Sequence, residues 1–142
     1  MTAKKYLQGI RDLEMKIRQR QTQVNFLREK ASAAQAIRYD KDIVKSSVSD
    51  SKLENDIATY TDIEREIEKA KLIFENRRNK IIGEIHELED GRYVNMLFKR
   101  YVEYKRYEKI ADEMGYSFDY VRHLHGEALK AFNEKILKDN TK

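Results

Sequence analysis

Side chains of several chemical kinds follow one another in "SFDYVRH", residues 117–123. The candidates for contacts to nucleobases carry a hydroxyl, a ring, a carboxylate, a guanidinium and an imidazole: Ser117, Phe118, Asp119, Arg122 and His123. Groups of these types hydrogen-bond base edges or pack against the methyl group of thymine. Arg122 is the strongest candidate, because a guanidinium can donate two hydrogen bonds to O6 and N7 of guanine. We therefore expect this segment to contact the bases of duplex DNA.

Basic residues gather just before that segment. Lysine and arginine side chains neutralise phosphates and fix the register of a protein on a duplex without reading its sequence. The residues expected to contact DNA phosphates are Lys99, Arg100, Lys105, Arg106 and Lys109.

The residues of this region do not have the arrangement expected of a metal site or an enzyme active site. His123 and His125 are two residues apart, so on a helix they point to different faces. His123 and Glu127 have the spacing of one face, but a zinc site normally needs three or four ligands. The sequence also lacks a glycine-rich phosphate loop and a serine in a nucleophile elbow. We expect no metal, no cofactor and no enzymatic activity.

Two helices separated by a glycine turn would position these side chains. Ile110, Ala111 and Met114 form one apolar face, and Gly115 can end the first helix with a positive φ. Ser117 is placed to cap the second helix. Its expected inward face is Val121, Leu124, Ala128, Leu129, Phe132 and Ile136. With a helix in front, capped by Asp90, this order predicts a helix-turn-helix module.

Apolar heptads predict a long helical hairpin before this module. The first stripe is Tyr6, Ile10, Leu13, Ile17, Arg20, Val24, Leu27, Ala31 and Ala34. The second stripe is Leu53, Ile57, Tyr60, Ile63, Ile67, Ala70, Phe74, Ile81, Ile85 and Leu88. A polar linker over roughly residues 39–50 separates them. Neither stripe can be buried alone, so an antiparallel pair is expected, with self-association as a further step. Aromatic residues at helical spacing, Phe26 among them, are interpreted as core.

Composition agrees with an all-α protein. The chain has 142 residues, 38% of them charged, with no proline, no cysteine and five glycines. Residues 1–45 carry 11 Lys/Arg against 5 Asp/Glu, whereas residues 46–91 carry 7 against 12, so the two arms should attract each other. No apolar run approaches the ~20 residues that span a membrane. The first residues lack a signal core. We expect a cytoplasmic protein.

Residues 100–132, "RYVEYKRYEKIADEMGYSFDYVRHLHGEALKAF", resemble the helix-turn-helix of sigma-70 region 4. The shared pattern is Ile110-Ala111, Met114-Gly115-Tyr116-Ser117, Val121-Arg122 and Ala128-Leu129. The whole chain is similar to small phage-encoded transcriptional regulators of the RinA and ArpU types. Sigma factors favour arginine where Phe118 and Tyr120 stand, so the resemblance does not extend to recognition of an ordinary −35 element. No region 2 is recognisable, so the chain does not resemble a complete sigma factor.

The sequence thus predicts a hairpin over residues 1–90, for dimerisation or partner binding, and a DNA-binding domain over residues 91–142. The expected function is that of a sequence-specific regulator of transcription in a bacterial host, encoded by a phage or prophage. Its expected partners are duplex DNA, a second copy of the chain and RNA polymerase. Two alternatives stay open: a helical structural or adaptor protein, and a DNA-binding subunit of a phage packaging complex.

Overall fold

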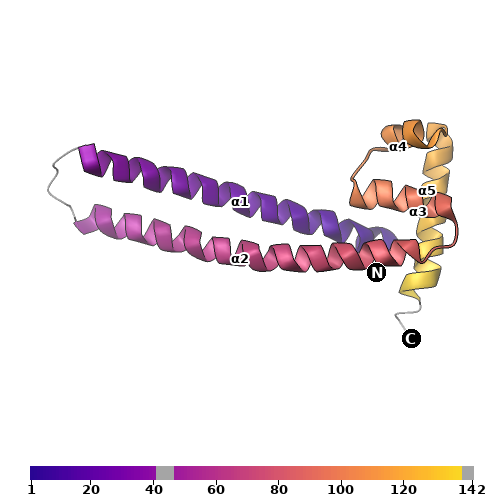
Figure 1. The fold of residues 1–142 in the computed structure, drawn as a ribbon, viewed down its shortest axis with the longest axis horizontal. Helices are drawn as coiled ribbons and strands as arrows, with labels where there is room; N and C mark the ends of the chain where they lie inside the picture. Colours follow the sequence, from indigo (N-terminus) through magenta and orange to yellow (C-terminus); the bar gives the residue numbers. More distant parts are fainter. Residues whose placement is uncertain (41–46, 139–142) are drawn as a thin grey trace. The chain divides into compact units, whose positions relative to one another are not determined.

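The computed structural model describes residues 1–40 and 47–138, and this part of the chain contains helices and no strand. The all-α class expected from the sequence is confirmed. The elements in order are α1 (Ala3–Asp40), α2 (Ser47–His86), α3 (Gly91–Leu97), η1 (Phe98–Val102), α4 (Tyr107–Met114), α5 (Phe118–Phe132) and η2 (Asn133–Leu137) (Figure 1). The two η segments are short π-helical turns that continue α3 and α5.

The linker expected over residues 39–50 is shorter than predicted at both ends. Helix α1 continues to Asp40 and α2 already begins at Ser47. Serine and aspartate are weak helix formers, which favoured a loop, but they are tolerated in the end turns of a helix. The rest of that predicted linker, residues 41–46, lies outside the described residues.

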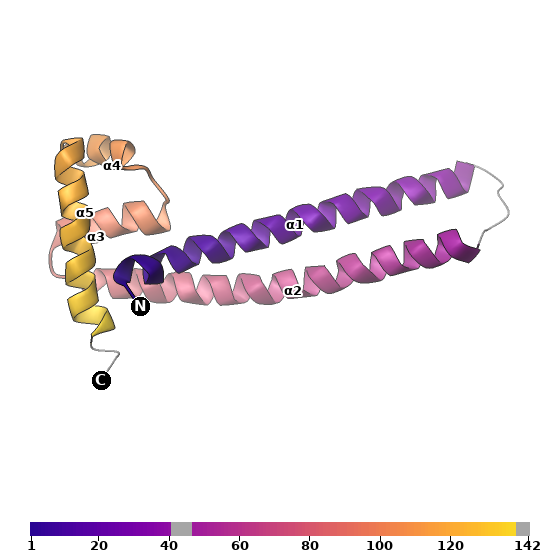
Figure 2. The same cartoon turned by 180° about the vertical axis from the view of Figure 1, so that it is seen from behind.

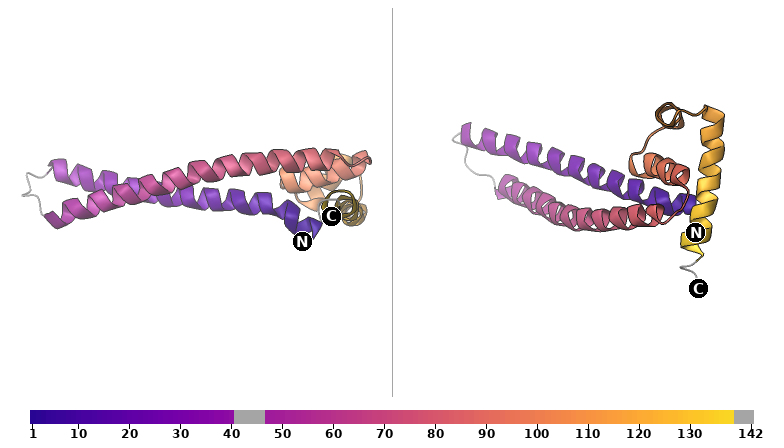
Figure 3. Two further views of the ribbon diagram at one scale, coloured as in Figure 1. Left: turned by 90° about the horizontal axis from the view of Figure 1, so that it is seen from below. Right: turned by 45° about the vertical axis from the view of Figure 1, so that its right-hand side comes forward.

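Residues 14–73 form one compact unit, an antiparallel pair made by the facing parts of α1 and α2 (Figure 3). Ile17, Val24 and Ala31 are buried on α1 at intervals of seven, and Ile63 and Ile67 are buried on α2. This spacing confirms the heptad stripe for these positions. Opposite charges flank the seam: Arg28 pairs with Glu64, and Lys30 Nζ lies 3.9 Å from Asp56 Oδ2.

The interpretation of Phe26 as a core residue is wrong. Its side chain is 67% exposed, whereas Val24 is fully buried. The two residues are separated by about 200° around a helix with 3.6 residues per turn, so they lie on opposite faces. Tyr60 is half-buried and carries Arg28 Cζ 5.4 Å from its ring centroid.

The second compact unit combines residues 1–13 with the chain from Phe74 onward. Within it α3 and α4 pack on α5, and α5 runs across the direction of the last turns of α2 (Figures 1 and 2). Its single apolar core includes Leu7 and Ile10 from α1, Ile85 from α2, and Leu124 and Phe132 from α5. The core therefore does not divide at residue 90, where the sequence predicted the boundary, because the first turns of α1 and the last turns of α2 pack into the core around α5. We call this part the head unit.

A matched pair of leucines tests this division. Leu7→Ala should lower the free energy of unfolding by about 2–5 kcal/mol. The Leu7 side chain has no exposed surface, so its removal leaves a cavity in the core. Leu72→Ala should change it by less than about 0.5 kcal/mol, because Leu72 is 61% exposed. Chemical denaturation followed by circular dichroism measures both. Equal losses would contradict the placement of Leu7 in the core.

Candidate nucleic-acid interface

The turn between α4 and α5 has the geometry that the sequence predicted. Helix α4 ends at Gly115, whose φ of 72° lies in the left-handed region that L side chains rarely adopt. The amide of Tyr116 donates to the carbonyl of Ala111 at 3.0 Å, which closes the end of the helix. Ser117 then caps α5, because its Oγ accepts a hydrogen bond of 3.1 Å from the amide of Tyr120.

Helix α5 separates an inner face from an outer one. Val121, Leu124 and Ala128 are fully buried, and Ala111 of α4 is also buried, so a small side chain stands where the two helices approach. The five side chains expected to contact bases, Ser117, Phe118, Asp119, Arg122 and His123, are all exposed. All five are therefore exposed on the surface formed by the cap and the first two turns of α5. We call this surface the α5 front.

Aromatic contacts hold part of the α5 front in place. Arg122 Cζ lies 5.9 Å from the centroid of the Phe118 ring, and Phe118 meets Tyr107 edge to face at 6.3 Å. Arg100 lies over the Tyr107 ring at 4.4 Å. Arginine is attracted to the negative face of an aromatic ring. The guanidinium of Arg122 is thus partly positioned before any ligand binds. His123 is positioned differently, with Nε2 2.9 Å from Glu127 Oε1.

The five basic residues expected to contact phosphates fall into two groups. Lys99 and Lys105 both donate to Glu113, Lys99 at 3.4 Å and Lys105 to Oε2 at 2.7 Å. Arg100 is half-buried and donates from Nη1 to the carbonyl of Lys105 at 2.9 Å. In contrast, Arg106 and Lys109 are exposed, and within residues 1–40 and 47–138 neither forms an ion pair.

Glu113 was not singled out by the sequence, yet it controls the charge of this surface. Its hydrogen bond raises the pKa of the Lys105 ammonium, and the same bond lowers the pKa of the Glu113 carboxyl below its ordinary value. The carboxylate offsets part of the positive charge of Lys99 and Lys105. Arg106 and Lys109 are therefore the two exposed cations of this set of five that no carboxylate pairs within residues 1–40 and 47–138.

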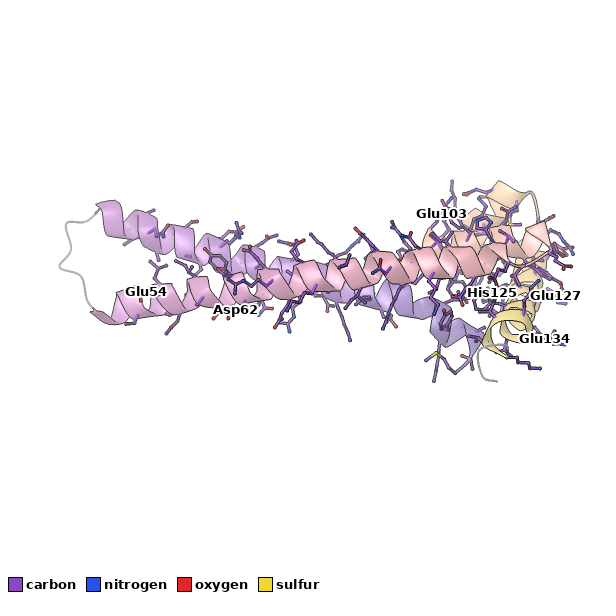
Figure 4. All side chains as sticks on the ribbon, turned by 60° about the horizontal axis from the view of Figure 1, so that its bottom comes forward. Glu54, Asp62, Glu103, His125, Glu127 and Glu134 are labelled. Atoms are coloured by element: carbon purple, nitrogen blue, oxygen red, sulfur yellow. The ribbon has the colours of Figure 1, made fainter. Side chains whose placement is uncertain are left out.

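His125 is the second residue whose role the sequence did not reveal. It is 8% exposed and lies on the inner side of α5 (Figure 4). Tyr101 Oη is 2.7 Å from Nε2 of its ring, and Tyr107 Oη is 3.2 Å from Nδ1. A neutral imidazole has one donor and one acceptor, so one tyrosine accepts and the other donates. Only its position next to Leu124, on the inward side of α5, could have indicated burial.

Burial lowers the pKa of His125 to about 4, and the positive charges of Arg100 and Lys4 act in the same direction. Burial likewise raises the pKa of Tyr101 to about 12. His125 is therefore neutral in the folded protein and joins η1, α4 and α5 beneath the α5 front.

A third contact ties α3 to α5. Asp90 caps α3, as predicted, by accepting a hydrogen bond of 2.9 Å from the amide of Arg92. The Arg92 side chain returns to Asp90 and also donates to Tyr120 Oη at 2.7 Å. The hydrogen bond from the Arg92 side chain lowers the pKa of the Asp90 carboxyl. Tyr120 thus helps to join α5 to α3.

Comparison with protein-family models, with curated proteins and with solved structures finds no match to this chain. In the part of the chain that the structure describes, no three His, Asp or Glu side chains are arranged so that they could hold a metal ion. No helix among the described residues is long and apolar enough to cross a membrane.

His125 predicts how stability depends on pH. The unfolded histidine binds a proton near pH 6.5 and the folded one only near pH 4. The preference for neutral His125 thus contributes fully to the free energy of unfolding above pH 6.5. Up to about 3 kcal/mol of that free energy is lost as the pH falls to 4. In His125→Gln the free energy of unfolding should fall less steeply over this window. Denaturation at half-unit pH steps measures the slope, and His86→Gln, at an exposed position, should keep the parent's slope. An unaltered slope in His125→Gln would contradict this account.

Proposed function

We propose that the chain is a sequence-specific DNA-binding protein that reads duplex DNA with the α5 front. The observation that carries the proposal is the turn itself. Gly115 and Ser117 join two helices at a packed corner, and the second helix exposes Arg122 and His123 on its first turns. A helix presented in this way can enter the major groove with its N-terminal residues against base edges.

The charges around the turn support the same function. Arg106 at the start of α4 and Lys109 one turn later present uncompensated cations to a phosphate backbone. Lys99 and Lys105 are held by Glu113, so their contribution to phosphate binding is smaller than that of Arg106 and Lys109. Arg122 supplies the base contact, two hydrogen bonds to guanine in the major groove.

The resemblance of residues 100–132 to sigma-70 region 4 supports a role in transcription, in the cytoplasm of a bacterial host. On this proposal the protein is a phage or prophage regulator. Its helical pair, residues 14–73, associates with a second copy or contacts RNA polymerase. Selection of duplexes from a random pool, followed by mapping onto the source genome, tests this role. Enrichment upstream of an operon supports a regulator, enrichment at a packaging site supports a packaging subunit, and no enrichment supports an adaptor without DNA specificity.

Arg122 provides the test of base recognition. Arg122→Ala should weaken binding to the selected duplex by about 1–3 kcal/mol and leave binding to unrelated duplexes nearly unchanged. Titration of both duplexes by fluorescence anisotropy measures the difference. Arg65→Ala, at an exposed position of the helical pair, should bind like the parent. A loss of equal size on every duplex would remove Arg122 from base recognition.

Arg106 provides the test of phosphate binding. In Arg106→Gln the plot of log K against log salt should become shallower by about 0.9, with equal loss on all sequences, because one fewer counterion is released. Lys105→Gln should change this slope less, since its ammonium already binds Glu113. If Lys105→Gln has the larger effect, Glu113 does not hold that cation in solution.

A further inference from the structure

A second surface of the head unit has features that DNA binding does not use. A cavity of about 340 Å³ lies between the first turns of α1 and the last turns of α2. Its lining is mostly apolar and includes Gly9, Ile10 and Ile81. The two isoleucines are buried, with 1% and 4% of their surface exposed. We call this cavity the α1–α2 groove.

Three cations surround this apolar floor. Lys5 comes from α1, and Arg77 and Lys80 come from α2. All three are exposed, and none of them forms an ion pair with another described residue. No carboxylate lines the groove. Glu84 is buried, accepts a hydrogen bond from Tyr6 Oη, and is not among the residues that line the groove.

The groove lies away from the α5 front. Tyr6, which lines it, packs on Phe132 with ring centroids 5.9 Å apart. Phe132 is the last residue of α5, fifteen positions after Ser117, so the two sites are separated by about 20 Å along the helix. A ligand in the groove therefore leaves the α5 front free for DNA.

We infer that the α1–α2 groove binds a short amphipathic segment of a partner protein, with apolar side chains on Ile10 and Ile81 and carboxylates beside Lys5, Arg77 and Lys80. The three cations and the apolar floor together indicate which kind of ligand fits the groove. A segment with apolar and acidic faces matches both features. A DNA backbone would match the cations but leave the apolar floor uncovered. This inference goes beyond DNA binding and does not depend on it.

The experiment is a selection of peptides from a displayed random 16-residue library on the full chain. Peptides that bind should combine acidic residues with apolar ones at helical spacing. Their affinities are then measured by fluorescence anisotropy for the parent and for variants of the groove. A selection that yields no acidic peptide overturns the inference.

Two variants change the groove in independent ways. The triple variant Lys5→Gln, Arg77→Gln, Lys80→Gln removes the cations, and Gly9→Leu fills the floor while keeping them. A Cβ at Gly9 meets no atom within 4 Å, and leucine is the better helix former, so this variant should fold. Each variant should bind the selected peptides at least about tenfold more weakly. The matched control Lys16→Gln, Arg65→Gln, Lys69→Gln removes the same charge from exposed positions of the helical pair and should bind like the parent.

Two further readouts separate the other occupants. Duplex affinity at fixed salt should fall no further in the groove triple variant than in the matched control, and a selective fall would make the groove a DNA surface and overturn the inference. Sedimentation should give the same mass for the parent and for Gly9→Leu. A lower mass in that variant would place a second copy of the chain in the groove, which also overturns it. Failure of Arg122→Ala to alter DNA selectivity would leave the peptide results unaffected.

Discussion

The inner face of α5 is the surface against which the head unit is assembled. Helices α3 and α4 pack on it directly, and Tyr6 of α1 packs on Phe132 near its end. Because Val121, Leu124 and Phe132 are fully buried, the direction of α5 is determined by apolar contacts along its whole length. The backbone positions of the outer side chains are then fixed by the same packing, with no further loss of backbone conformational entropy. Helix α5 thus has one face that packs in the core and another whose side chains are exposed in a fixed orientation.

Polar contacts supplement the packing at three places around α5. The Ser117 cap fixes where the helix begins, the Arg92–Tyr120 contact joins it to α3, and His125 joins it to η1 and α4. Within the described residues no buried side-chain nitrogen or oxygen lacks a hydrogen-bond partner. A buried imidazole would be costly if its two nitrogens were unpaired, and the two tyrosines remove that cost. The polar network thus adds specificity to a core that apolar burial stabilises.

The local features were predictable from sequence because each depends on few residues. Gly115, Ser117 and Asp90 act through their own backbone and the next turn, so the composition of a short segment was sufficient. The helical stripes were predictable for the same reason, and heptad spacing located Ile17, Val24 and Ala31. Phe26 shows the limit of that approach, since one aromatic residue two positions from the stripe lies on the opposite face.

Contacts between distant segments could not be predicted in this way. Glu113 is fourteen residues from Lys99, and His125 is twenty-four from Tyr101. In each pair the two residues lie on different helical elements separated by a break in the helix, so no periodicity within one helix reveals the pair. The same reason explains why the head unit extends into α1 and α2. Ile10 and Ile85 fitted the hairpin stripes equally well, and only the packed structure shows that they belong to the core around α5.

The head unit is built from two segments that are far apart in the sequence, and this constrains the order in which the chain can fold. Leu7 belongs to the same core as Phe132, which is synthesised much later than Leu7. Contacts at such separation carry a large loop-closure cost and form late. The helical pair between them can form first and bring residues 13 and 74 together, which shortens the remaining loop. The helical pair would then act during folding as an internal template, so that the head unit closes only after α5 has been synthesised.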